Sequence, residues 1–161
     1  MNKQEIYSYL NFKNIKYEVF NHIPVYNMAD IEKIVLPNKE YDAKNLFIRD
    51  DKKINYYLIT IKGNKKINLK EFRKINKTRP LTFASAEELL NILKLTPGSV
   101  SPLGLLNDKE HQVKFYLDKE FALDSYIYVH PNDNIATICL KISDLINIIK
   151  EHGNSIDIIE L

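Results

Sequence analysis

The chain is poor in several residues on which many small proteins depend. Its 161 residues include one cysteine, four glycines, two methionines and no tryptophan. A single cysteine excludes a disulfide scaffold and is typical of a reducing compartment, so we expect a cytoplasmic protein. Cys139 lies in an apolar, strand-like run and is interpreted as a small buried side chain. Apolar runs are short and residues 1–10 lack an export signal, so neither export nor membrane insertion is expected.

Familiar catalytic motifs are absent as well. The sequence has no G-x-S-x-G nucleophile elbow, no H-E-x-x-H, no C-x-x-C and no G-x-x-x-x-G-K phosphate loop. The four histidines are scattered, so we predict no metal site, and no cofactor is expected. Any reaction carried out by this chain would therefore depend on positioning and backbone electrostatics rather than on a strong nucleophile.

Length and hydrophobic pattern predict one α+β domain over residues 1–161. The hydrophobic content of 45% is enough for a single substantial core. Helices are expected at 2–14, 27–35, 69–77, 85–93 and 143–152. Strands are expected at 17–20, 44–49, 56–61, 103–106, 113–117, 126–129, 135–140 and 156–159. Hairpins mixed with helices, without a repeating βαβ rhythm, favour the α+β class.

Glycine and proline are concentrated in one short segment, residues 96–108, which holds two of the four glycines and two of the six prolines. Gly98 leaves room for a ligand or another stretch of chain to approach the backbone, and the prolines restrict the loop at both ends. The alternative is an ordinary tight turn. The N–H groups that could point at an anion or an ester carbonyl are those of Ser99, Val100 and Ser101.

Positive charge is concentrated between residues 62 and 79. This window holds eight basic residues and one acidic residue, so it carries +7, which leaves −5 for the rest of a chain of net charge +2. Lysines act as point charges and no aromatic series is interleaved, so the pattern suits phosphate contact rather than base reading. The alternative is a solvated helix face. The predicted docking residues are Lys65, Lys66, Lys70, Arg73 and Lys74.

Several separated motifs follow one another along the chain. They are Lys44-Asn45-Leu46-Phe47, Leu81-Thr82-Phe83-Ala84-Ser85, Gly98-Ser99-Val100-Ser101-Pro102 with Asn107-Asp108, and His130-Pro131 with Asn134, Ala136 and Thr137. Together they resemble the family of YbaK and prolyl-tRNA editing domains, and within it the free-standing aminoacyl-tRNA deacylases of the ProXp-ala and PrdX type. The resemblance covers nearly the whole chain. It implies a YbaK-like fold, in which a curved, mixed and largely antiparallel sheet is flanked by helices.

The resemblance also implies a reaction, the hydrolysis in trans of a mischarged aminoacyl ester at the 3′ end of tRNA. Alanine on proline tRNA is the expected substrate, ahead of cysteine or serine. The acceptor end of tRNA(Pro) is the expected partner and prolyl-tRNA synthetase a second candidate, whereas neither a membrane nor DNA is expected. Leu103 and Ile135 depart from the commonest family pattern, which bears on pocket size. The alternative function is a non-catalytic module that binds an amino acid or an aminoacyl-tRNA.

The residue roles implied by the resemblance begin with Lys44, which would face the pocket and hold the terminal nucleotide or the polarised carbonyl. Position alone favours a structural lysine at a strand start. His130 could be a general base, a substrate anchor or a structural histidine, and His22 near the entrance could be structural or a contact. The loop residues expected to stabilise the reaction are Gly98, Ser99 and Val100. The residues expected to bind substrate are Asn45, Ser101, Pro102 and Thr137, although strand alternation points Asn45 away from Lys44.

Overall fold

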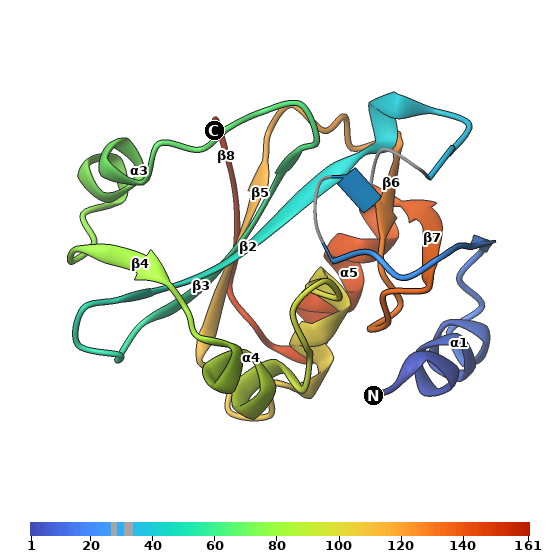
Figure 1. Ribbon diagram of the computed structural model, residues 1–161, viewed down its shortest axis with the longest axis horizontal. Helices are drawn as coiled ribbons and strands as arrows, with labels where there is room; N and C mark the ends of the chain where they lie inside the picture. The colour runs from blue at the N-terminus through green and yellow to red at the C-terminus, as the bar shows by residue number, and fades with distance from the viewer. Residues whose placement is uncertain (27–28, 31–33) are drawn as a thin grey trace.

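The computed structural model describes residues 1–26, 29–30 and 34–161, and these form two β-sheets flanked by helices (Figure 1). The larger sheet has the order β4-β2-β3-β5-β8, with strands Leu81–Phe83, Ala43–Asp50, Tyr56–Lys62, Val113–Asp118 and Ile156–Ile159. The smaller sheet has the order β1-β7-β6, with strands Tyr17–Asn21, Ala136–Lys141 and Tyr126–Val129. The helices are α1 (Lys3–Phe12), α3 (Leu69–Asn76), α4 (Ala86–Leu93) and α5 (Ile142–His152).

The strand pairing confirms the expected α+β class and a mixed, largely antiparallel arrangement. Within the described residues only the pairs β3-β5 and β5-β8 are parallel. The strands divide into two sheets, however, rather than forming the one sheet that was expected. The predicted hairpin of β2 and β3 is present, with Lys44 opposite Ile61 and Asn45 opposite Thr60.

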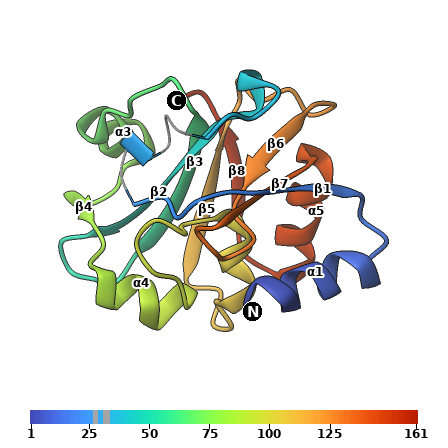
Figure 2. The same ribbon diagram turned by 45° about the vertical axis from the view of Figure 1, so that its right-hand side comes forward.

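Apolar side chains form two cores on opposite faces of the larger sheet. Alternation along β2 sends Phe47 into the main core and Ile48 into a smaller one. Helix α3 covers the smaller core through the buried ring of Phe72, whereas α1, α4 and α5 pack into the main core. The ribbon shows α3 beside the larger sheet and α1 below the smaller one (Figure 2). Lys44 therefore lies on the face that carries α3, because it shares the alternation of Ile48.

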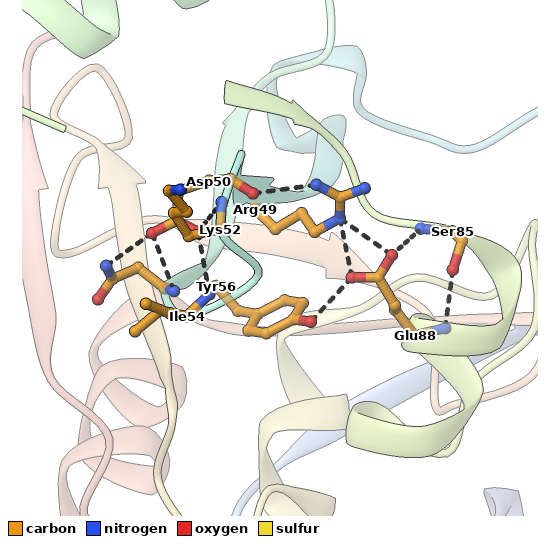
Figure 3. A network of polar contacts seen from close by, with 8 residues as sticks. Arg49, Asp50, Lys52, Ile54, Tyr56, Ser85 and Glu88 are labelled. Atoms are coloured by element: carbon orange, nitrogen blue, oxygen red, sulfur yellow. Dashed lines mark hydrogen bonds and ion pairs between the residues drawn. The ribbon is translucent and has the colours of Figure 1, made fainter. Parts of the chain in front are cut away.

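A polar network fastens α4 to the hairpin (Figure 3). Ser85 and Glu88 form the capping box predicted from the sequence, with Glu88 N–H donating to Ser85 Oγ at 3.1 Å. The Glu88 carboxylate also accepts from Arg49 Nε at 3.0 Å and from the Tyr56 hydroxyl at 2.8 Å. Burial alone would raise the pKa of Glu88, but these hydrogen bonds lower it to about 2. Burial and the bond to Glu88 raise the pKa of Tyr56 to about 12.

The expected elements are confirmed to within two residues except at 103–106 and 27–35, and the structure adds the 3-10 helix η1 (Lys39–Tyr41) and strand β4. Residues 103–106 are not a strand but belong to the 3-10 helix η2 (Pro102–Asn107), because Pro102 presets the first position and Ser101 Oγ accepts the Leu103 N–H. Strand β4 was not expected, since three residues give no periodic signal. The helix predicted over 27–35 lies largely outside the described residues. Within the described residues no helix is long and apolar enough to span a bilayer.

Candidate active site

A cavity of about 420 Å³ opens where the start of β2 lies beside the end of β6. Strand β4 pairs with residues 48–50 of β2, so among the described residues the start of β2 has no sheet partner on that side. The volume lies within the range of about 300–1,000 Å³ that is typical of small-molecule sites. Its walls come from Val25, the segment 34–39, the start of β2, the end of β6 and the start of β7. Four predicted site residues line it together, namely Lys44, Asn45, His130 and Thr137.

Lys44 and Asn45 are consecutive residues of β2 whose side chains lie on opposite faces of the strand, and each of them lines the cavity. The Lys44 ammonium donates to the backbone carbonyl of Lys65 at 2.7 Å, which uses one of its three donors. Asn45 Oδ1 accepts from the hydroxyl of buried Thr60 at 2.6 Å. That bond fixes the orientation of the Asn45 amide, whose Nδ2 has no hydrogen-bond partner in the described part of the chain. Each side chain thus keeps donors that a substrate could use.

The imidazole of His130 lies in the cavity wall. Burial lowers its pKa and a positive charge on His22 would lower it further, although the bond to the Ala136 carbonyl favours the protonated ring. That carbonyl lies 2.9 Å from Nδ1 and can only accept, so Nδ1 carries the proton and Nε2 keeps a lone pair. The buried Ser101 hydroxyl donates to the His130 carbonyl at 2.6 Å and holds its backbone in place.

Asp42 supplies the one carboxylate among the described residues that line the cavity. Burial raises its pKa, and the charges of Lys39 and Lys62 oppose that rise. Gly63 packs tightly against it, since a Cβ at position 63 would lie 2.7 Å from Asp42 Cβ. The described residues hold no group of three or more histidines, cysteines or carboxylates that could bind a metal.

The Gly98 loop lies behind the cavity rather than in it, and this corrects several sequence hypotheses. Gly98 has φ +93°, and the backbone that approaches it closely is the Val25 carbonyl of the same chain. The Ser99 N–H donates to the Thr96 carbonyl at 3.1 Å, so it is not available as an oxyanion donor. Ser101 and Pro102 are buried and cannot touch substrate in this structure. The N–H groups of Val100 and Ser101, the two other predicted donors, form no hydrogen bond within the described residues, and their role stays a prediction.

The basic window of the sequence gathers side chains on α3, whereas Lys65 is paired within the protein. Its ammonium lies 3.0 Å from Asp118 and 2.9 Å from Glu120, so its charge is paired within the protein, and its role in docking stays a prediction. Lys66 is exposed. A shallow depression over α3 is lined by Lys70, Arg73, Lys74, Lys77 and Thr78.

Comparison with known proteins decides the family. The model of the aminoacyl-tRNA editing domain matches residues 22–148. This chain belongs to that family. The editing domain is 43% identical over 160 residues to the prolyl-tRNA editing protein ProX of Acetoanaerobium sticklandii, covering 99% of this chain and 97% of the relative.

Two further relatives agree with this assignment. The domain is 33% identical over 144 residues to prolyl-tRNA synthetase associated domain-containing protein 1 of Mus musculus, covering 87% of this chain and 85% of the relative. Its fold matches the crystal structure of a candidate trans-editing enzyme for prolyl tRNA synthetase with a TM-score of 0.69, at 17% identity and covering 98% and 94% of the two chains.

His22 is the site residue that sequence reasoning left without a role. It follows β1 and lies beside both Thr137 and His130, with its ring centroid 6.1 Å from that of His130. The sequence offered only a histidine in a turn before Pro24, and nothing local to that turn indicates that Thr137 lies within reach. Long-range pairing of β1 with β7 creates the contact.

Proposed function

We propose that this editing domain hydrolyses the ester that links alanine to mischarged proline tRNA. The observation that carries the proposal is the cavity, which gathers Lys44, Asn45, His130 and Thr137 from three strands and their ends. The family assignment and the name of the ProX relative support the same substrate class. A cavity of limited volume suits a small side chain, and excludes large ones by steric overlap.

The proposed chemistry needs no protein nucleophile. Water attacks the ester carbonyl carbon and the bond to the ribose oxygen breaks. Of the two protons of the water, one passes to the ribose oxygen and the other is released to solvent as alanine leaves as its carboxylate. The remaining donors of Lys44 stabilise the charge that develops on the carbonyl oxygen. His130 Nε2 accepts a hydrogen bond from the water or a ribose hydroxyl and so positions it.

The tRNA would reach this cavity across α3. Lys44 lies on the face of the larger sheet that α3 covers, so the basic depression and the Lys44 ammonium share one side of the molecule. Phosphates bound by Lys70, Arg73 and Lys74 would guide the acceptor end toward the cavity. Prolyl-tRNA synthetase is a candidate partner, in keeping with the names of the associated-domain relatives.

A panel of labelled esters tests this function. The protein is incubated with Ala-tRNA(Pro), Cys-tRNA(Pro) and Pro-tRNA(Pro), and release of each amino acid is followed over time. We expect fast release of alanine and survival of the proline ester. Preferential release of cysteine would show that the substrate is Cys-tRNA(Pro) and not Ala-tRNA(Pro). If all three esters survive while the tRNA binds, the chain is a binding module and the hydrolase proposal fails.

A further inference from the structure

His22 directly follows β1 and is held by hydrogen bonds to the chain beside it. Its backbone N–H donates to the Ile135 carbonyl at 2.9 Å, which ties it to the chain just before β7. Its ring makes two hydrogen bonds, from Nδ1 to the Ile23 carbonyl at 2.8 Å and between Nε2 and Thr137 Oγ1 at 2.9 Å. Both ring nitrogens are therefore committed within the protein.

These contacts determine which atoms carry protons. The Ile23 carbonyl can only accept, so His22 Nδ1 carries the proton and, in the neutral ring, Nε2 is an acceptor. The Thr137 hydroxyl must then donate to Nε2, and its oxygen is left with lone pairs only. Thr137 lines the cavity, where it presents an acceptor.

We propose that His22 is a positioning residue, which holds the Thr137 hydroxyl as an acceptor for an N–H or O–H group of the aminoacyl end of the tRNA. This inference rests on the proposed function. Without His22 the hydroxyl could rotate and offer its proton to the cavity, and the substrate donor would lose its partner.

The His130 ring shows the same arrangement a short distance away. Its Nδ1 donates to the Ala136 carbonyl, and Nε2 is again left as an acceptor. The cavity wall thus carries two acceptors, Thr137 Oγ1 and His130 Nε2. In each case a backbone carbonyl accepts the Nδ1 proton of an imidazole ring, that of His22 beside Thr137 and that of His130 itself. Such a pair suits substrate groups that donate hydrogen bonds, and it suits a carbonyl oxygen poorly.

Two substitutions of His22 separate its two contacts. Asparagine can keep a donor near the Nδ1 position for the Ile23 carbonyl but is too short to reach Thr137, whereas glutamine can reach the Nε2 position. We expect His22→Asn to lower kcat for alanine release about tenfold, the value of one hydrogen bond, and His22→Gln to recover most of it. Thr137→Val should match His22→Asn, and Thr137→Ser should stay close to wild type.

The double variant decides whether His22 acts through Thr137. If it does, adding His22→Asn to Thr137→Val causes no further loss of kcat, because the bond is already gone. Losses that multiply, or a His22→Gln protein no better than His22→Asn, would overturn the inference. Melting temperatures of all variants show whether a loss of kcat reflects unfolding.

A second measurement does not depend on the reaction. Imidazole ¹⁵N chemical shifts of the wild-type protein report the tautomer of each histidine, and His22 should be the Nδ1–H form. An Nε2–H form would overturn the inference even in an active enzyme. If the wild type releases no alanine, the proposed function fails, and the tautomer then still decides whether Thr137 is held as an acceptor.

Discussion

Replacing Gly98 tests how the loop behind the cavity shapes it. A Cβ at this position would lie 2.4 Å from the Val25 carbonyl oxygen, whereas ordinary contact begins at 3.4 Å, so that oxygen must withdraw by about 1 Å. Val25 lines the cavity. A displacement of about 1 Å in a catalytic site can lower the rate about 100-fold. We therefore expect Gly98→Ala to reduce kcat/KM for alanine release from Ala-tRNA(Pro) about 100-fold.

Gly153→Ala is the matched control. Gly153 also has a positive φ, +111°, but its Cβ would contact the His111 ring at 3.3 Å, and neither residue lines the cavity. A left-handed backbone costs a non-glycine residue about 1–2 kcal/mol, so the melting temperature of each variant should lie at least about 2–8 °C below that of the wild type. Activity is measured well below both melting temperatures. If Gly98→Ala loses no more activity than Gly153→Ala, the close approach of Val25 does not shape the cavity.

Three other predictions address stability, docking and positioning. The contribution of Glu88 to the free energy of unfolding should be fully present above pH 4.5 and should be lost as the pH falls toward 2, because the folded state lowers the pKa of the Glu88 carboxyl. In urea titrations the free energy of unfolding of Glu88→Gln should depend less on pH than that of the wild type. An equal pH dependence in the two proteins would contradict this prediction. Charge reversal at Lys70 and Lys74 should raise KM for the tRNA more at low salt than at high salt, and a salt-independent rise would rule out phosphate docking there. Ser101→Ala should lower kcat about tenfold, because the His130 carbonyl loses its buried donor, and an unchanged kcat would refute that role.

Local signals predicted most of the fold. The polar loop at 50–55 indicated the β2-β3 hairpin, and Ser85 three residues before Glu88 indicated the start of α4. Those signals act within a few residues, and both elements form where the signals predict them. The division into two sheets could not be predicted in this way, because it depends on β1 pairing with β7 across more than a hundred residues.

The site shows the same limit. Lys44, Asn45, His130 and Thr137 were named through the family resemblance, and the fold does bring them to one cavity. The ion pair of Lys65 could not be predicted, because its partner Asp118 lies 53 residues away in the sequence. The bond from the Ser99 N–H to the Thr96 carbonyl could not be predicted either, because the sequence alone does not show how this turn closes.

Single-turnover release of alanine from Ala-tRNA(Pro) tests the central claim most directly, with wild type compared against Lys44→Ala and the exposed control Lys109→Ala. We predict that wild type and the control release alanine at similar rates, and that Lys44→Ala is at least about tenfold slower at an unchanged melting temperature, since one ammonium donor at a developing oxyanion is worth about 3 kcal/mol. Release by Lys44→Ala at the wild-type rate would contradict the account, because the cavity would then not be the place where the ester is cleaved.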